Sequence, residues 1–541
     1  MLTTRCLGCG PIGRVAVIVL AILGAHAIAS QDAEPKPQEQ AEPILPAAPV
    51  VTEHSVTING RTIEYRATAG VLPIREDPSG KVRANIFFIA YERLAPRGDR
   101  PESDTPHADS KDSARTLADA SPGDRPITFS FNGGPGSSSV WLHLGLLGPR
   151  RVEFGPEGEP LPPPARLVDN EFSWLDLTDM VFIDPVSTGF SRAAEGQNAT
   201  QFHGLDEDVR AVGEFIRLYL TRHHRWLSPK YLIGESYGTT RAAALATELQ
   251  DRLGIYLNGI CFVSTVFNFQ TLSFEPGNDT AYWLFLPTYT ATAFHHKRLS
   301  GPLAEDLEKA LAESERFARN EYQIALSRGD SLSEEERTAI AARLAELTGL
   351  DASFILRSDL RVPIFAFTKE LLRSQSRTVG RLDSRYQGID RSDATDRTGY
   401  DPSYAAILGP FTAALNHLVR AELKFESDLP YEILTGRVRP WNFGRDNRFS
   451  DVSESLRAAM SANRNLRAWF ASGYYDLATP HFAADYTIDQ LRLDPELRRN
   501  VTHTYYRSGH MMYVRLEDLR RMKTEASAFY AGGLPTQDRG R

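Results

Sequence analysis

Cysteine is scarce in this sequence, with three among 541 residues. Cys6 and Cys9 lie in an N-terminal segment that we expect to be removed, which leaves only Cys261. A single cysteine excludes an intramolecular disulfide, although oxidising compartments would permit one. The length of the chain and its hydrophobic content of 42% are ample for a large core.

The sequence also has no apolar run long enough to cross a bilayer, which takes roughly 20 residues. Residues 15–23 form a shorter run, which follows Arg5 and Arg14 and precedes the small residues 27–29. This order of basic, apolar and small residues is typical of a secretory signal peptide. We therefore expect residues 1–29 to be cleaved near Ala29, and the protein to be exported, periplasmic or secreted, without a stable membrane anchor.

Positive charge is in deficit. The chain has 61 basic and 69 acidic side chains, a net charge of −8. Loss of residues 1–29 removes two arginines and no acids, which leaves 59 basic against 69 acidic side chains and a net charge of −10. A protein this acidic has no electrostatic surface for DNA or RNA, so we expect no nucleic-acid partner.

The remaining chain divides by composition. Residues 30–50 are rich in Pro, Ala, Gln and Glu and predict a disordered lead-in. Alternation of polar and apolar residues over 55–64 and 84–91 predicts antiparallel strands. Residues 95–125 are rich in Asp, Ser and Pro, which indicates a mobile surface insertion.

From residue 126 onward the pattern is that of a doubly wound, mostly parallel sheet. Apolar segments of strand length alternate with helical stretches such as 205–220 and 241–253. The predicted strands are 127–131, 180–183, 231–233, 259–264, 467–471 and 502–506.

A long interval with helical composition, roughly residues 271–440, interrupts this series. Ser333 is followed three residues later by Glu336, a capping box ahead of periodic apolar positions. We interpret the interval as a helical cap inserted over the sheet's carboxyl edge, between a first core part at 51–270 and a second at 441–541.

Residues 234–238, Gly-Glu-Ser-Tyr-Gly, lie directly after a predicted strand and before an alanine-rich helix. A serine at such a turn has a strained backbone and needs small neighbours, which Gly234 and Gly238 supply. The helix that follows directs free N–H groups and its positive dipole end at the site. Ser236 is therefore a candidate nucleophile.

A serine hydroxyl needs a base and an acid that orients the base. In α/β-hydrolases the acid and the histidine follow the nucleophile in that order, on loops after late strands. Asp476 follows the predicted strand 467–471, and His510 follows 502–506. Ser236, Asp476 and His510 thus form a candidate triad.

The segment Asn132-Gly133-Gly134-Pro135-Gly136 follows the predicted strand 127–131. Glycines let backbone N–H groups approach a substrate, so the N–H groups of Gly134 and Tyr237 are candidate oxyanion donors. A phosphate-binding loop is the rival interpretation, but no Gly-Lys-Ser/Thr follows.

Four segments together resemble the serine carboxypeptidases, the S10 peptidases. They are Asn-Gly-Gly-Pro-Gly-Ser-Ser at 132–138, Asp-Pro-Val-Ser-Thr-Gly-Phe-Ser at 184–191, Gly-Glu-Ser-Tyr-Gly at 234–238 and Gly-His-Met at 509–511. The resemblance extends from about residue 50 to the end. It implies an α/β-hydrolase fold with a helical insertion, the triad and oxyanion donors named above, peptide substrates cleaved one residue from the C-terminus, and no metal or other cofactor.

The resemblance also implies that Asn132, Gly133 and Glu235 bind the substrate's terminal carboxylate. Glutamate can bind a carboxylate only when one of the two carries a proton, so this contact weakens as pH rises. The family's second buried glutamate falls on Leu146 here. Arg241 is a candidate replacement cation, and a structural ion pair is the alternative for it.

Other functions use the same residues. An esterase or acyltransferase would share every catalytic residue and differ in its acyl pocket. A prolyl aminopeptidase also has a Gly-Gly-Pro-Gly loop, but Tyr237 occupies a position that is usually Trp there. A non-catalytic binding protein on a hydrolase fold would be expected to lack the nucleophile or the histidine. The sequence makes no prediction of oligomeric state.

Overall fold

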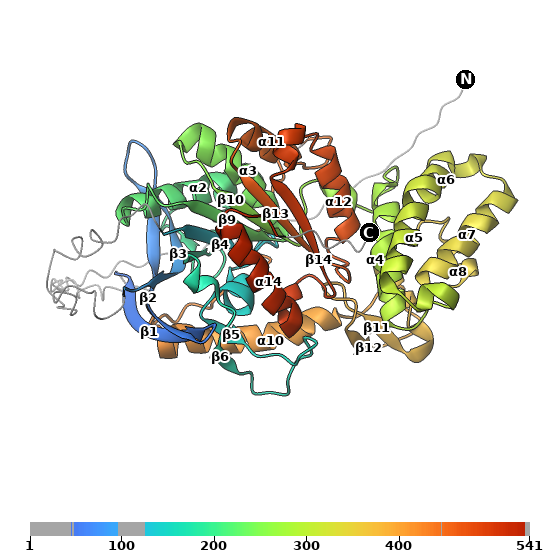
Figure 1. Ribbon diagram of the computed structural model, residues 1–541, viewed down its shortest axis with the longest axis horizontal. Helices are drawn as coiled ribbons and strands as arrows, with labels where there is room; N and C mark the ends of the chain where they lie inside the picture. Colours follow the sequence, from blue (N-terminus) through green and yellow to red (C-terminus); the bar gives the residue numbers. More distant parts are fainter. Residues whose placement is uncertain (1–44, 46–47, 96–124, 445, 536–541) are drawn as a thin grey trace, which may run out of the picture. The chain divides into compact units, whose positions relative to one another are not determined.

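A computed structural model describes residues 45, 48–95, 125–444 and 446–535 (Figure 1). All of them belong to one compact unit that runs from Ile44 to Arg541. The predicted signal peptide, nearly all of the predicted lead-in and the predicted insertion between residues 95 and 125 lie outside the described residues. Within the described ranges, no helix is long and apolar enough to cross a membrane.

The described strands form a ten-stranded sheet in the order β1-β2-β3-β7-β4-β9-β10-β13-β14, with β8 paired to β3. From β1 to β7 neighbours run antiparallel, and from β7 to β14 they run parallel. The bounds are β1 Val50–Ile58, β2 Arg61–Arg75, β3 Val82–Arg93, β4 Ile127–Phe131, β7 Asp179–Ile183, β8 Arg192–Ala193, β9 Lys230–Glu235, β10 Gly259–Val263, β13 Arg467–Gly473 and β14 Val501–Tyr506.

The six strands predicted for the parallel part are all present, each within three residues of the predicted ends. Strands β4, β7, β9, β10 and β14 are buried along their whole length, which explains their continuous apolar runs. The prediction at 55–64 needs correction, because a turn divides it into β1 and β2. Asn59 and Gly60 have φ of 49° and 76°, which suits a two-residue hairpin, and the alternation continues through it.

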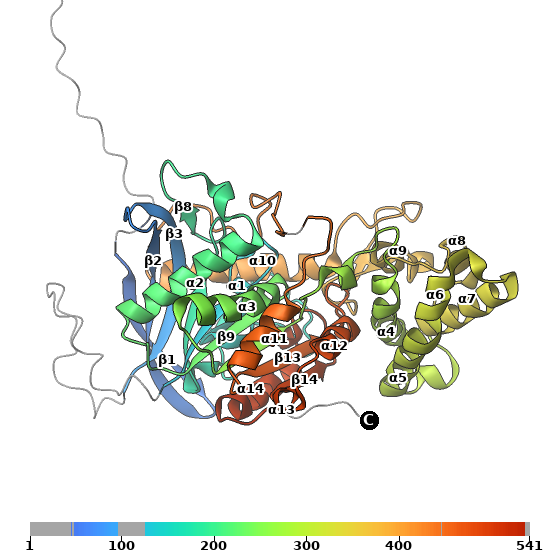
Figure 2. The ribbon, with the colours of Figure 1, turned by 90° about the horizontal axis from the view of Figure 1, so that it is seen from above.

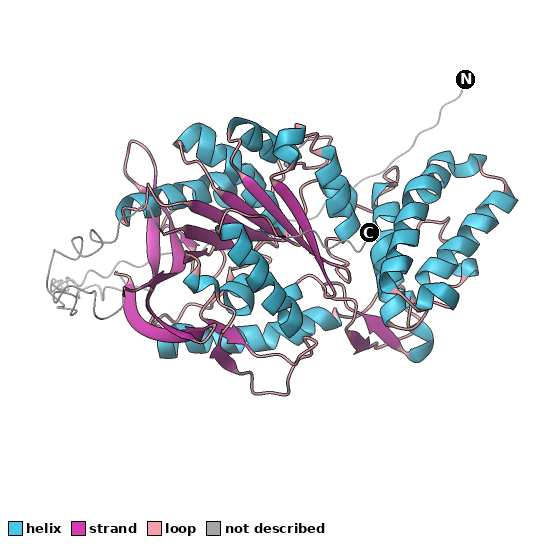
Figure 3. Cartoon of the chain, in the orientation of Figure 1, coloured by secondary structure: helices cyan, strands magenta, loops and turns pink. Residues whose placement is uncertain are grey.

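Helices cover both faces of the sheet (Figures 1, 2 and 3). Helices α2, α3 and α11 share one apolar cluster with Leu232 of β9. Helices α10 and α14 share another with Tyr231 and Ile233, the alternate residues of the same strand. The bounds are α1 Val140–Leu142, α2 Leu205–Arg222, α3 Tyr237–Thr247, α10 Pro402–His417, α11 Ser453–Ala462, α12 His481–Gln490, α13 Pro495–Arg498 and α14 Leu516–Tyr530.

Between β10 and β13 the chain forms a helical insertion with its own apolar cluster. The capping box is confirmed: Glu336 N–H donates to Ser333 Oγ at 3.2 Å, and Ser333 N–H donates to the Glu336 carboxylate at 2.8 Å. Helix α10 belongs to the interval predicted as a cap, yet it packs in the same apolar cluster as α14, against one face of the sheet. The insertion helices are α4 Thr280–His295, α5 Leu307–Phe317, α6 Gln323–Arg328, α7 Glu334–Thr348, α8 Ala352–Arg357 and α9 Ile364–Glu370.

Two short antiparallel pairs complete the described structure. They are β5 Arg150–Val152 with β6 Leu167–Asp169, and β11 Arg377–Val379 with β12 Gln387–Ile389. The segment between β11 and β12 reaches the loops that follow β13 and β14, as described below.

Candidate active site

Ser236 lies at the sharp turn between β9 and α3. Its backbone has φ 59° and ψ −129°, a conformation that non-glycine residues rarely adopt. A Cβ atom on Gly234 would lie 2.2 Å from the Gly238 carbonyl oxygen, and one on Gly238 would lie 2.8 Å from the Phe131 carbonyl oxygen. Both glycines are therefore required by close backbone approach. Ser236 is partly exposed between buried neighbours.

Asp476 and His510 meet at the carboxyl ends of β13 and β14. His510 Nδ1 lies 2.8 Å from Asp476 Oδ2, and both side chains are buried. Three further donors hold the carboxylate: the N–H groups of Ala478 and Thr479 to Oδ1 at 2.8 and 3.0 Å, and the Thr479 hydroxyl to Oδ2 at 2.7 Å. The acid is thus fixed in one orientation toward the imidazole.

The electrostatic surroundings of His510 favour its charged form. Burial alone would lower the pKa of His510, but the Asp476 carboxylate and its hydrogen bond raise that pKa above the ordinary value, and Glu235 adds to the rise. An imidazole of this kind is a stronger base than a free one and is stabilised when it takes up a proton.

Backbone contacts connect Ser236 to the histidine loop through β10. Ser236 N–H donates to the Val263 carbonyl at 3.0 Å, and the next residue, Ser264, donates from its hydroxyl to the His510 carbonyl at 2.7 Å. Among the described residues the Ser236 hydroxyl has no hydrogen-bond partner. The hydrogen bond between nucleophile and base is often long before substrate binds, so this geometry suits a resting site.

The glycine loop after β4 touches the turn that holds Ser236. A Cβ on Gly133 would lie 2.4 Å from the Tyr237 nitrogen and 2.7 Å from the Glu235 carbonyl oxygen. Gly134 is exposed with φ 102°, and its N–H has no partner among the described residues. Tyr237 begins α3, where N–H groups lack intrahelical partners. The candidate oxyanion donors therefore lie together.

Arg241 is fully occupied inside the protein. Its Nε donates to Asp208 Oδ2 at 2.7 Å, and its Nη1 donates to the Asn132 carbonyl at 2.7 Å. The side chains of Arg241 and Asp208 are 1% and 4% exposed. The guanidinium also lies over the Phe131 and Tyr237 rings. Of the two alternatives for Arg241, a substrate-binding cation and a structural ion pair, the structure shows the ion pair. The same guanidinium also fixes the backbone carbonyl of Asn132.

Glu235 is buried directly before Ser236. Burial raises the pKa of Glu235 to about 7 against the opposing effect of His510 and of the hydrogen bond from Tyr513. The Tyr513 hydroxyl donates to Glu235 Oε2 at 2.5 Å. Leu146 is 0% exposed in the apolar core, so no second carboxyl lies at that position. Tyr513 was not among the residues predicted from sequence, where its only signal is its place three residues after His510.

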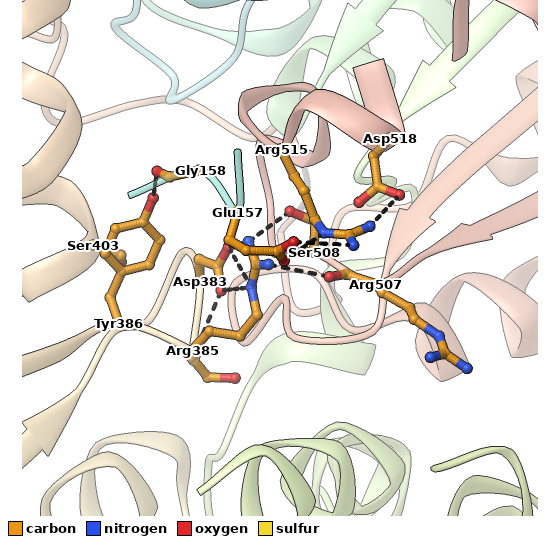
Figure 4. A network of polar contacts seen from close by, with 12 residues as sticks. Glu157, Gly158, Asp383, Arg385, Tyr386, Ser403, Arg507, Ser508, Arg515 and Asp518 are labelled. Atoms are coloured by element: carbon orange, nitrogen blue, oxygen red, sulfur yellow. Dashed lines mark hydrogen bonds and ion pairs between the residues drawn. The ribbon is translucent and has the colours of Figure 1, made fainter. Parts of the chain in front are cut away.

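The segment between β11 and β12 holds the loops of Asp476 and His510 from the insertion side. The Leu382 carbonyl accepts from His510 N–H at 2.6 Å, and the Arg381 carbonyl accepts from Leu477 N–H, one residue past Asp476, at 3.1 Å. Figure 4 shows the neighbouring polar contacts around Asp383 and Arg385. These residues too were absent from the sequence-based site.

Asp383 and Arg385 form a buried ion pair at 2.6 Å, with side chains 8% and 9% exposed. The Asp383 carboxylate also accepts from Gly509 N–H at 3.0 Å, and Arg385 donates to the Ser508 hydroxyl at 2.8 Å. The pair thereby fixes the two residues that precede His510. Among the described residues, no group of three or more His, Cys, Asp or Glu side chains is placed to hold a metal ion.

The family model described as serine carboxypeptidase matches residues 115–524. The chain belongs to the serine carboxypeptidase family. Within this family, similar proteins include serine carboxypeptidase-like 5 of Arabidopsis thaliana, 30% identical over 137 residues, which are 24% of this chain and 30% of that protein. The pheromone-processing carboxypeptidase KEX1 of Yarrowia lipolytica is 30% identical over 140 residues, 25% of this chain and 21% of that protein.

The similarity thus spans less than a third of the length of these two relatives of the serine carboxypeptidase family. Among solved structures, the peroxisomal α/β-hydrolase Lpx1 of Saccharomyces cerevisiae covers 88% of this chain and 92% of its own, at 12% identity and a TM-score of 0.33. The mostly parallel sheet with helices on both faces is the predicted α/β-hydrolase fold. The protein is therefore a member of the serine carboxypeptidase family with an α/β-hydrolase fold.

Proposed function

We propose that the protein is a serine-type carboxypeptidase that removes C-terminal residues from peptides. The observation that carries this proposal is Glu235, a buried carboxyl next to the candidate nucleophile with a pKa raised to about 7 by burial. A carboxylic acid that keeps its proton in weakly acidic solution can donate a hydrogen bond to a carboxylate. Placed beside Ser236, it favours a substrate that ends in a carboxylate.

In the proposed reaction Ser236 Oγ attacks the last peptide carbonyl while His510 Nε2 takes the hydroxyl proton. Asp476 holds the imidazole through Nδ1 and stabilises its charged form. The N–H groups of Gly134 and Tyr237 bind the developing oxyanion. His510 then gives its proton to the leaving amine, the C-terminal residue departs, and a water molecule hydrolyses the acyl-enzyme by the same steps.

The substrate's carboxylate would be bound by Asn132, Gly133 and Glu235. Asn132 is fixed by Arg241 at its carbonyl and by Leu142 N–H at its side-chain oxygen, the latter at 3.1 Å. Glu235 must carry a proton for this contact, whereas His510 must be neutral to act as base. The two requirements predict a bell-shaped dependence of kcat/KM on pH for substrates with a free carboxylate.

The test compares an N-blocked dipeptide with its C-terminal amide and with an N-blocked amino acid ester, between about pH 4 and 8. Release of the last residue from the free acid by the wild-type protein, but not by Ser236→Ala, is the expected result. Hydrolysis of the ester alone, dependent on Ser236, would contradict the proposal. That outcome would favour an esterase or acyltransferase. The observation that supports this alternative is the buried Leu146 at the position of a second acid.

We also propose that the enzyme works on peptides outside the cytoplasm after removal of residues 1–29. The support is the order of basic, apolar and small residues in that segment. Sequencing the N-terminus of the protein recovered from the exported fraction of an expressing cell tests this, and an intact Met1 in that fraction would contradict it.

A further inference from the structure

The carboxyl of Glu235 has a phenol as its hydrogen-bond partner. The Tyr513 hydroxyl lies 2.5 Å from Glu235 Oε2, and the ring is 1% exposed. Tyr513 belongs to a short turn, Met512–Val514, between the His510 loop and α14. The partner of the candidate carboxylate-binding group thus comes from the same loop as the candidate base.

The space for this ring is built into the segment that follows the glycine loop. A Cβ atom on Gly145 would lie 2.3 Å from Tyr513 Cε2 and 2.6 Å from Cδ2. Only glycine therefore allows the ring its present position. The next residue, Leu146, is fully buried and apolar. Gly145 thus provides room for a phenol, and the neighbouring position 146 carries no second carboxyl.

The titratable groups that act on Glu235 are His510, Asp476 and Tyr513. His510 and the hydrogen bond from Tyr513 favour the ionised carboxyl, and Asp476 opposes it. Burial raises the pKa of Tyr513 well above its ordinary value, and Glu235 raises it further. Tyr513 therefore stays a neutral donor throughout the range in which Glu235 titrates.

We propose that Tyr513 is a positioning residue for binding of the substrate's carboxylate. Its hydroxyl anchors Glu235 through Oε2, so that the acid proton resides on Oε1 and is donated to the substrate. The inference rests on the proposed function. An oxygen that accepts a strong hydrogen bond acts as the carbonyl oxygen of the acid, which leaves the other oxygen to carry the proton. Recognition then depends on one titrating group rather than on a proton shared between two acids.

Removing the Tyr513 hydroxyl has two expected effects. A donor to Glu235 stabilises the carboxylate form, so its loss raises the pKa of Glu235 further. A hydrogen bond to a charged group corresponds to a shift of about one unit. The high-pH limb of kcat/KM for the free acid should therefore move up by about one pH unit in Tyr513→Phe. Loss of the anchor should also raise KM for the free acid several-fold with little change in kcat.

The experiment measures kcat and KM against pH for the N-blocked dipeptide and for the ester, which has no carboxylate. Tyr513→Phe should shift the high-pH limb for the dipeptide upward, and the ester profile should show no such upward shift. Gly145→Ala, which displaces the ring but keeps the hydroxyl, should shift the limb in the same direction. Tyr322→Phe is the matched control, because that buried hydroxyl donates to the Leu360 carbonyl at 2.5 Å within the insertion.

A second measurement does not depend on peptidase activity. The carboxyl stretch of Glu235, assigned by its loss in Glu235→Gln, is followed by infrared difference titration in the Ser236→Ala background. The band should titrate about one pH unit higher when Tyr513→Phe is added. An unchanged titration, or an equal shift of the dipeptide and ester limbs, would overturn the inference. Failure of the proposed function alone would appear as loss of dipeptide cleavage with the infrared shift still present.

Discussion

Substitution of Gly133 by alanine tests the oxyanion site most directly. The new Cβ would lie 2.4 Å from the Tyr237 nitrogen, whereas ordinary contacts begin near 3.4 Å. The atoms that it meets are backbone atoms of the Ser236 turn, so the glycine loop must retreat by about 1 Å. A displacement of that size can cost about 10²-fold, and loss of one oxyanion donor costs about 10²–10³ in kcat. We expect a fall in kcat within that range.

The assay is ester hydrolysis, because an ester has no carboxylate and separates the chemical step from the role of Gly133 in carboxylate binding. Gly399→Ala is the matched control: a Cβ there meets nothing within 4 Å outside its chain neighbours, and the position is exposed. It should keep the wild-type kcat and the wild-type Tm.

A Gly133→Ala variant that folds with near wild-type Tm and retains kcat within about threefold would refute this prediction. Such a result would mean that displacing the glycine loop does not slow the chemical step. It would remove the Gly134 N–H from the list of oxyanion donors and leave the Tyr237 N–H to act with another group.

Three further predictions concern buried carboxyls. Asp476→Asn should lower kcat for the ester by about 10³–10⁴ with a small effect on KM, because the amide holds the imidazole of His510 in the wrong tautomer. An unchanged kcat would exclude Asp476 as the orienting acid. Asp383→Asn should lower Tm and kcat together, because it leaves Arg385 buried without a carboxylate, at a typical cost of about 3–5 kcal/mol; adding Arg385→Met should recover Tm but not kcat, and recovery of both would show a role in stability alone. Burial raises the pKa of Asp184 to about 7, so the folded protein keeps a proton that the unfolded chain releases above about pH 4. The free energy of unfolding should therefore fall by up to roughly 4 kcal/mol between pH 4 and 7. Asp184→Asn should flatten that slope in urea titrations, and an equally steep slope in the variant would assign it to other groups.

The parts of the fold that could be predicted from sequence are those with a local cause. Strand β4 was predicted with the observed ends, because buried parallel strands read as continuous apolar runs between polar turns. Ser236 could be found because its turn demands glycines on both sides, and the structure confirms that both are needed sterically. The approach of Asp476 to His510 followed from their places after late strands of a parallel sheet.

The missed features depend on contacts between distant segments. Tyr513 becomes the partner of Glu235 only because Gly145, far away in the chain, leaves space for its ring. The ties from Leu382 and Asp383 to the histidine loop come from a segment without a motif of its own. Helix α10 has helical composition like the rest of the insertion, and nothing local tells that it packs beneath the sheet. Periodicity identifies such elements but does not place them.

The ties between the insertion and the catalytic loops bear on how this enzyme can be altered. Since Leu382 and Asp383 hold the backbone of His510 and Gly509, the insertion is a structural part of the candidate active site and not an exchangeable module. Transplanting an insertion from a relative without this segment would give a folded sheet with an unanchored histidine. During biosynthesis, likewise, the site can become active only after the chain has been completed through β14 and has docked onto residues contributed much earlier. The appearance of activity would then indicate that the whole compact unit has assembled.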